Sequence, residues 1–97
     1  MTTPNITHLQ AVVLDALSSP VSGRELRKLL AKKGVKRSSP AFYSLMNRME
    51  EMSLIKGWYE NREISGQIVR ERHYEIRAAG VRALQDCCLF YANLGVV

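Results

Sequence analysis

The sequence predicts a single α+β domain that is mostly α-helical, and three observations support this. Its 97 residues suit one domain, and 46% of them are hydrophobic, which is enough for a core. Three segments with helical spacing of apolar residues come first, followed by two short alternating segments and a last helical one. Three helices, a two-stranded hairpin and a closing helix are the order of a winged helix-turn-helix. In that fold the third helix enters the major groove of DNA and the hairpin, or wing, reaches the backbone or minor groove beside it.

The first two helices are predicted by the same capping signal. A serine or threonine followed three residues later by glutamine or glutamate has the form of a capping box, which satisfies free amides at a helix start. Such a box opens residues 7–17 and again residues 22–33, and each segment carries an apolar stripe at helical spacing. Gly34 ends the second helix, because glycine enters the left-handed region at little cost. Val21, between the two helices, has room for an extended piece of only one or two residues.

The third helix is predicted to run from Ser39-Pro40 to about Met52. A serine before a proline is a good helix start, because the serine caps free amides and the proline lacks an amide hydrogen that the first turn leaves unused. We interpret the methionines of this helix as core side chains and not as ligands of a soft metal. The apolar face carries Phe42, Leu45, Met46 and Met49, and the opposite face carries Tyr43, Ser44, Asn47, Arg48 and Glu51.

Two strands are predicted over residues 54–60 and 69–76. Residues 61–68 form the loop between them, since this stretch is rich in turn residues. Strand alternation places Arg70 and Arg72 on one face of the hairpin and the intervening glutamate on the other.

The final segment is apolar and nearly uncharged, since Asp86 is the single charged side chain after Arg82. An apolar side of a terminal helix that one small domain cannot cover is typical of a protein contact. We therefore assign residues 78–97, within one domain of residues 1–97, to a C-terminal dimerisation helix. Together with the first helix it would form a homodimer interface of Leu9, Val13, Val81, Leu84, Cys88, Tyr91 and Leu94.

Positive charge is concentrated in the middle of the chain. The formal net charge is +5, and residues 24–48 contain eight lysines and arginines but only one acid, Glu25. This distribution favours a polyanion as partner for the middle of the chain and a protein as partner for its apolar end. A solvated basic face with no partner is the alternative.

The predicted polyanion is double-stranded DNA. An asparagine on the outer face of the third helix can pair with N6 and N7 of adenine, and a tyrosine there can donate to a phosphate. The basic turn before that helix would clamp a phosphate at the helix N-terminus. The alternatives are a tyrosine packed against the wing, a solvated asparagine, and wing arginines that pair with Glu60 and Glu71 across the hairpin. The predicted DNA-binding residues are Arg24, Lys36, Arg37, Ser38, Ser39, Tyr43, Ser44, Asn47, Arg48, Arg62, Gln67, Arg70 and Arg72.

Other classes of function find no motif in the sequence. A glycine-rich phosphate loop and a nucleophile-histidine-carboxylate set are both missing, so we expect no enzyme. His8 and His73 have no cysteine or carboxylate at ligand spacing, and we therefore expect no metal and no cofactor. No apolar run is long enough for a membrane span. The adjacent Cys87 and Cys88 suit a reducing cytoplasm, which is the expected location.

Four segments of the sequence resemble the PadR family of bacterial transcriptional regulators. SGREL (residues 22–26) is similar to that family's HGYEL, and FYSLMNRMEEMSLI (residues 42–55) is similar to its LYPALHRLEEEGLI. RERHYEIRAAGVRAL (residues 70–84) resembles RRKYYRLTEAGRRAL, where the second strand runs into the dimerisation helix. LQAVVLDALSSPVSG, which begins at Leu9, resembles the LGLLSEGPLHG-type start of the family.

This resemblance implies a dimeric repressor that binds an inverted-repeat operator and is released by a small molecule, here a small hydrophobic effector. The chain departs from the family pattern at several positions. Ser44 replaces a proline, Asn47 a histidine, Ser53 a glycine, Arg77 a helix-capping threonine and Ser22 a histidine. The alternative function is a winged-helix module for protein-protein assembly that does not bind DNA, since fold alone does not fix function.

Overall fold

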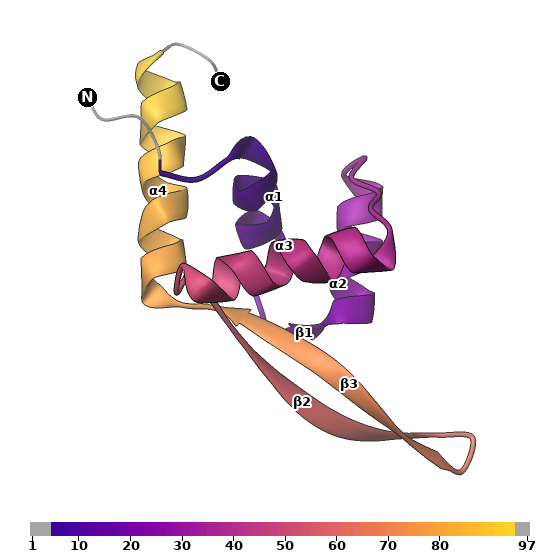
Figure 1. Cartoon of the computed structure of the whole chain (residues 1–97). Coiled ribbons are helices and arrows are strands. Elements are labelled where there is room, and N and C mark those ends of the chain that lie inside the picture. Colours follow the sequence, from indigo (N-terminus) through magenta and orange to yellow (C-terminus); the bar gives the residue numbers. More distant parts are fainter. Residues whose placement is uncertain (1–4, 95–97) are drawn as a thin grey trace.

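The structure is a computed structural model that describes residues 5–94. It confirms the predicted α+β class and the order of a winged helix (Figure 1). In chain order the elements are α1 (His8–Ala16), β1 (Val21–Ser22), α2 (Gly23–Lys32), α3 (Ser39–Glu51), β2 (Ile55–Ile64), β3 (Gln67–Ile76) and α4 (Ala78–Asn93).

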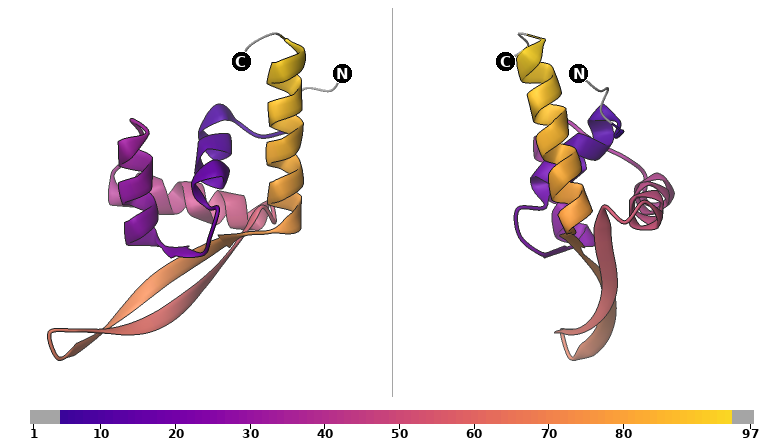
Figure 2. Two further views of the ribbon diagram at one scale, coloured as in Figure 1. Left: turned by 180° about the vertical axis from the view of Figure 1, so that it is seen from behind. Right: turned by 90° about the vertical axis from the view of Figure 1, so that its left-hand side faces the viewer.

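The helices form one body from which the wing projects. Helix α3 lies across α1 and α2, and α4 stands beside α1 at the far side from α2 (Figures 1 and 2). Strands β2 and β3 leave this body near the end of α3 and extend away from it as a twisted ribbon. The molecule therefore measures 53 × 25 × 22 Å along its principal axes. None of the helices within residues 5–94 is long and apolar enough to cross a membrane.

The core lies between the three N-terminal helices and the base of the wing. Met46 and Met49 have no exposed surface, which confirms that these two methionines pack in the core. For Met52 the prediction is wrong, because this side chain at the end of α3 is 39% exposed. Leu45, by contrast, is only half-buried at the edge of the core. The fully buried large side chains are Val13, Leu14, Leu17, Leu26, Phe42, Met46, Met49, Ile55 and Tyr74.

The helix starts follow the capping signals of the sequence, with one shift. Thr7 and Gln10 form the predicted reciprocal capping box, with bonds of 3.0 and 3.1 Å. Ser22 caps α2 by accepting a hydrogen bond from the Glu25 amide at 3.1 Å. Helix α3 begins one residue earlier than predicted, because Ser38 accepts from the Ala41 amide and is its cap. The proline then stands at the second helical position. Its missing amide hydrogen costs nothing there, because the amides of the first turn have no partner within the helix.

Helix α3 ends in a tight turn that directs the chain into the wing. The Leu54 amide donates to the Met49 carbonyl at 3.0 Å, and the Ser53 amide donates to the Glu50 carbonyl at 2.9 Å. These two bonds form a Schellman motif, in which the residue after the C-cap adopts a left-handed conformation. Ser53 occupies that position with φ +60°, although glycine is the residue that tolerates it best.

The wing is longer than predicted, and its loop is shorter. The strands pair from Ile55 with Ile76 to Ile64 with Gln67, so the predicted loop at 61–68 is wrong. Ser65 and Gly66 form a two-residue turn with φ values of +51° and +80°, the left-handed pair that matches the twist of a hairpin. Asn61, which we had assigned to the loop, pairs with Arg70 inside the ribbon. Cross-strand pairing here overrides the local turn preference of asparagine.

A third strand joins the wing to the helices. Val21 and Ser22, predicted as a short extended piece, form β1 and pair with Tyr74 and His73 of β3. The Tyr74 ring is 1% exposed and lies edge-on to Phe42 at 6.3 Å between ring centroids. Its Cε2 atom also lies 3.4 Å from where a β-carbon of Gly23 would be. Tyr74 therefore anchors β3 against both α2 and α3.

Helix α4 packs through its smallest residue. Gly80 lies so close to the Leu54 carbonyl that a β-carbon at this position would overlap it. Cys87, about two turns further along α4, is also buried, whereas Cys88 and Val81 are exposed. Burial and the neighbouring Cys88 raise the pKa of the Cys87 thiol. Arg77 precedes the helix and makes no capping bond with its side chain, yet α4 starts at the predicted residue.

Replacing Ser53 by glycine should stabilise the protein. Glycine removes the steric cost of a left-handed L-residue, so the free energy of unfolding should rise by about 1 kcal/mol. Urea denaturation of Ser53→Gly and wild type measures this difference. Ser53→Ala is the matched control, because it removes the hydroxyl group but keeps the strained β-carbon, and it should not stabilise.

Tyr74 should ionise only at strongly alkaline pH. Burial raises its pKa from 10.0 to about 12. Because the folded protein then holds this proton more tightly than the unfolded chain, Tyr74 contributes stability below pH 10.0 that is lost as the pH rises towards about 12. An absorbance titration at alkaline pH should show one late tyrosine step. Tyr74→Phe should abolish that step, and its persistence in this variant would contradict the assignment.

Candidate nucleic-acid interface

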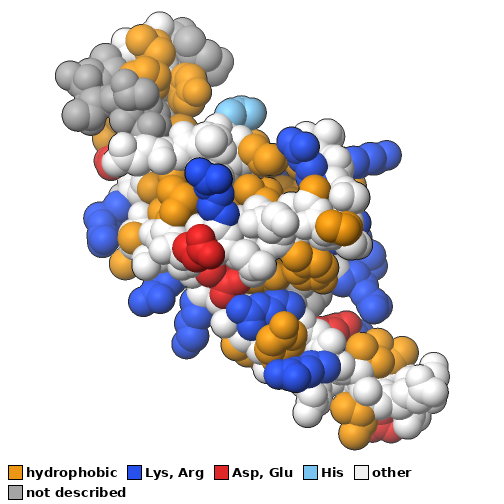
Figure 3. Space-filling view, viewed as in Figure 1, with side chains coloured by type: hydrophobic (Ala, Val, Ile, Leu, Met, Phe, Trp, Pro, Cys, Tyr) orange, Lys and Arg blue, Asp and Glu red, His pale blue; other side chains and the backbone are white. Residues whose placement is uncertain are grey.

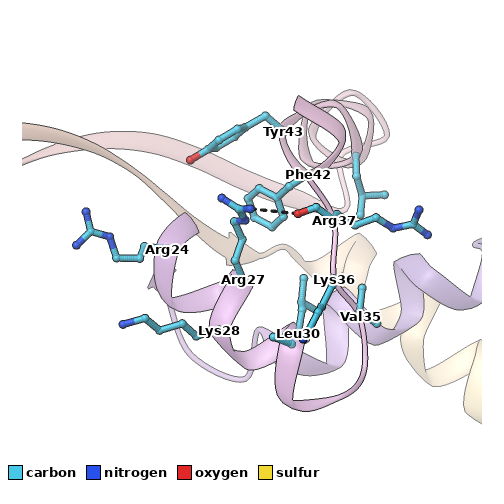
Figure 4. A pocket seen from close by; sticks show the side chains of 11 residues that line it. Arg24, Arg27, Lys28, Leu30, Val35, Lys36, Arg37, Phe42 and Tyr43 are labelled. Atoms are coloured by element: carbon cyan, nitrogen blue, oxygen red, sulfur yellow. Dashed lines mark hydrogen bonds between the residues drawn. The ribbon is translucent and has the colours of Figure 1, made fainter. Parts of the chain in front are cut away.

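Basic side chains surround a groove between α2 and α3 (Figure 4). The groove has a volume of about 570 Å³ and a floor of apolar residues that includes Leu30 and Phe42. Arg24 and Lys28 extend from α2 on one side, and Arg37 extends from the segment before α3 on the other. The charges thus spread outward and do not converge on one point. An extended polyanion matches such a surface better than a single small anion does.

Arg27 holds the turn between the two helices together. Its guanidinium donates to the Arg37 carbonyl at 3.1 Å and to the Ser39 hydroxyl at 2.8 Å. It also lies over the Phe42 ring, 5.7 Å from the centroid. This basic residue therefore positions the segment that carries Arg37, a role that no local pattern in the sequence indicates.

The two serines at the start of α3, Ser38 and Ser39, have their hydroxyl oxygens engaged within the protein. Ser38 caps α3 by accepting from the Ala41 amide at 3.3 Å, and Ser39 accepts from Arg27. Lys36 and Arg37 are exposed beside this helix N-terminus. Of the four predicted residues in the turn, the two basic ones have side chains directed to solvent, and the serines shape the turn that presents them.

The outer face of α3 lies where the sequence predicted it. Ser44, Asn47 and Arg48 are exposed. Tyr43 is 41% exposed, and its ring meets Phe42 edge-on at 5.1 Å between centroids. The Tyr43 hydroxyl lies next to Gly23, 3.5 Å from where a β-carbon would be. Tyr43 thus packs partly on the start of α2 and keeps part of its ring in solvent, between the two alternatives that the sequence left open.

The wing arginines divide into two groups. On the face towards α3, Tyr59 lies between Arg70 and Arg72, with guanidinium-to-centroid distances of 4.1 and 4.7 Å. Arg72 donates to Glu50 of α3 at 2.6 Å, and its side chain is only 23% exposed. Arg72 as a DNA contact stays a prediction, and in the structure its guanidinium is engaged with Glu50. Arg70 is exposed and held by the tyrosine ring.

Glu71 lies among cationic groups on the other face of the wing. Its carboxylate is within 3.8 to 3.9 Å of Arg24, Arg62 and His73. The side chain is 9% exposed, and neither oxygen has a hydrogen-bond partner among the described residues. The Arg62–Glu71 contact is the cross-hairpin pairing that the sequence offered as an alternative. Glu60 lies instead 3.2 Å from His73.

The tip of the wing carries no basic side chain, since no lysine or arginine lies between Arg62 and Arg70. Gln67 is exposed beside the turn, and Ile68 is 76% exposed. Figure 3 shows apolar and acidic side chains at this far end of the ribbon, and basic ones nearer the helices. The cationic part of the wing is therefore its middle and not its tip.

The predicted dimer residues separate into surface and core positions. Val13 has no exposed surface and packs in the core, so its assignment to a subunit contact is wrong. Leu9 and Leu84 are half-buried, and Cys88 is exposed. A groove of about 570 Å³ runs between α1 and α4, lined in part by Leu84, Cys88 and Tyr91. The large apolar side chains exposed on α4 are Val81, Leu89, Tyr91 and Leu94.

Two further residues of the surface, Tyr59 and Glu50, escaped the sequence analysis, and a third, Glu71, entered it only as an alternative partner of the wing arginines. Tyr59, Glu50 and Glu71 each contact an arginine that we had predicted to bind DNA. Tyr59 and Arg72 lie in strands that the sequence predicted, but which side chains they contact depends on how the wing packs against the helices.

Among the described residues no cluster of histidine, cysteine and carboxylate side chains could hold a metal ion.

The fold is similar to solved structures of PadR-family proteins. A PadR family transcriptional regulator from Eggerthella lenta DSM 2243 is 27% identical over 89% of this chain and 73% of its own, with a TM-score of 0.70. A PadR family transcription regulator from Clostridium difficile R20291 is 21% identical over 92% of both chains, with a TM-score of 0.76. A PadR-like transcriptional regulator from Bacillus cereus is 25% identical over 90% of this chain and 84% of its own, with a TM-score of 0.72. No family model and no curated protein matches the sequence.

Replacing Glu71 by glutamine should strengthen binding to generic duplex DNA. The change removes a negative charge within 4 Å of two arginines, Arg24 and Arg62, so affinity at low salt should rise roughly threefold. Fluorescence anisotropy measures this. Glu63→Gln removes the same charge near the wing tip and should have a smaller effect. Weaker binding by Glu71→Gln would mean instead that the carboxylate orients the arginines usefully.

Proposed function

We propose that this chain, which has the PadR-like winged helix-turn-helix fold, is a DNA-binding transcriptional regulator that represses its target as a homodimer in the cytoplasm. The observation that carries the proposal is the set of basic side chains on α2 and at the turn of Lys36 and Arg37, which line a groove beside α3. Structural neighbours that are described as transcriptional regulators add support.

In the proposed complex α3 lies in the major groove. Asn47 would pair with adenine there, and the Tyr43 hydroxyl would donate to a phosphate. Lys36 and Arg37 stand beside the N-terminus of α3, where free amides and the helix dipole favour a phosphate. Arg24 would contact the backbone from the start of α2. These contacts would combine sequence recognition with a large electrostatic contribution to affinity.

The middle of the wing would contact DNA beside α3. Arg70, held against the Tyr59 ring, and Arg62, on the opposite face of the ribbon, are the basic groups in position to do so. Because the tip has no basic residue, we assign the phosphate contacts of the wing to these two arginines. Gln67 at the tip would make a polar contact in the adjacent groove of the DNA.

A dimer would place two such surfaces on an inverted-repeat operator. Half-sites one helical turn apart, about 34 Å, match a two-fold symmetric pair of recognition helices. The exposed apolar residues of α4, among them Val81, Leu89 and Leu94, would be covered in the dimer. Occupation of the operator would then block RNA polymerase sterically.

The proposal includes a small hydrophobic effector. The groove between α1 and α4 has a suitable volume of about 570 Å³ and an apolar lining. In a dimer built on α4 this groove would lie at the subunit contact. A ligand there would change the distance between the two recognition helices and so release the operator.

Binding to duplex DNA from upstream of the protein's own gene tests the function. In fluorescence anisotropy at two salt concentrations, wild type should prefer some sequences and lose affinity steeply with added salt. Asn47→Ala should lose about 1 to 3 kcal/mol of binding free energy and relax the sequence preference. Arg37→Ala should weaken binding to all sequences alike and lower the salt slope by about one.

Asn93→Ala is the matched control, because it makes the same change as Asn47→Ala on an exposed residue of α4. It should leave DNA binding unchanged. A folded protein that binds no DNA at low salt would overturn the proposal and favour the protein-assembly module in its place.

A further inference from the structure

The wing meets the recognition helix through one short ion pair. Arg72 of β3 donates to Glu50 of α3 at 2.6 Å, and the two side chains are 23% and 21% exposed. The residues are 22 positions apart in the chain. Figure 3 shows acidic and basic side chains in contact where α3 meets the base of the ribbon. This pair is more sheltered than most ion pairs at a protein surface, so solvent screens it less.

The surroundings of the pair hold both groups in place. The Arg72 guanidinium lies over the Tyr59 ring at 4.7 Å and the Tyr74 ring at 5.9 Å from the centroids. Gly57 of β2 provides the space. A β-carbon there would lie 2.6 Å from a Glu50 oxygen and 2.7 Å from an Arg72 nitrogen. Any larger residue at this position would therefore push the pair apart.

Beyond this point the contact with the helices is looser, since Arg24 of α2 approaches the Glu71 carboxylate only to 3.8 Å and makes no hydrogen bond with it. From Trp58 to Arg70 every side chain is exposed or half-buried. The Schellman turn at Ser53 links α3 to β2, and from Gly57 to the tip the ribbon is about 23 Å long at 3.3 Å per residue. A change of 10° at the base would therefore move the tip by about 4 Å, which is a large part of the width of a DNA groove.

We propose that Glu50 and Arg72 are positioning residues that fix the angle between α3 and the wing. This inference rests on the proposed DNA-binding function. The pair makes the two elements one rigid surface, so that the wing arginines reach the backbone only when α3 lies correctly in the major groove. It thereby contributes to sequence selectivity without touching a base, and Glu50 itself is an anion that DNA would repel.

Single substitutions at Glu50 and Arg72 distinguish an effect of net charge from an effect on the angle of the wing. Glu50→Gln adds one unit of positive charge and Arg72→Gln removes one. If charge alone mattered, the first should strengthen and the second should weaken binding to every sequence. If the pair sets the angle, both should lower the ratio of affinities for a selected and a scrambled duplex, by roughly tenfold.

The experiment uses the full chain and a duplex selected by the wild-type protein from a randomised pool. Affinities for the selected and the scrambled duplex are measured for wild type, Glu50→Gln, Arg72→Gln and the exchanged pair Glu50→Arg with Arg72→Glu. We expect both single variants to lose selectivity and the exchanged pair to recover it to within about threefold of wild type. Recovery by exchange is an outcome that lost packing at either site would not produce.

A measurement without DNA separates this inference from the proposed function. Residual dipolar couplings of backbone amides give the orientation of the wing relative to α3. One alignment tensor should fit both elements in wild type but not in Glu50→Gln. Gly57→Ala keeps both Glu50 and Arg72 but separates their side chains, so one alignment tensor should also fail to fit both elements in this variant. It replaces Arg72→Gln if that variant fails to fold.

Unchanged selectivity in both single variants, with the wing orientation also unchanged, would overturn the inference. If wild type has no sequence preference, the proposed function fails. The dipolar couplings then still decide whether Glu50 and Arg72 fix the wing.

Discussion

The structure depends on how the base of the wing is anchored to the helices. A two-stranded ribbon in water has little stability of its own, so its place must come from contacts at one end. Tyr74 supplies the buried part of this anchor by packing against Phe42 and the start of α2. The Arg72–Glu50 pair supplies the directional part, and Gly57 leaves the room that it needs. Removing the side chain at one anchor would leave the other to hold the ribbon.

Acidic residues shape the basic surface as much as the basic residues do. Glu50 and Glu71 each hold an arginine of β3 or α2, and the latter carboxylate is almost fully buried among cationic groups. The positive charge that is left for a partner is therefore smaller than the composition implies and lies around Lys36, Arg37 and the middle of the wing. The acidic partners weaken the general attraction of this surface to polyanions, and they hold the arginine side chains in defined positions.

The basic residues and the exposed apolar residues of the protein lie on different elements. The basic groove, the outer face of α3 and the wing form one side, while the exposed apolar residues of α4 stand apart from it (Figures 1 and 4). The short helix α1 contributes Val13 and Leu14 to the core between them. In the proposed dimer, a change in how α4 packs on α1 would therefore move one recognition helix relative to the other without disturbing the wing anchor.

The sequence by itself determined the order of the elements and the outer face of α3, because capping boxes, apolar spacing and glycine stops act within a few residues. It failed on the length of the wing, where strand pairing overrode the turn preference of Asn61. It also assigned Arg72 to DNA and Val13 to a dimer contact, although the first is bound to Glu50 and the second is buried. Only the tertiary structure decided these positions, because which side chains meet across distant elements depends on the docking angle, and no local pattern encodes that angle.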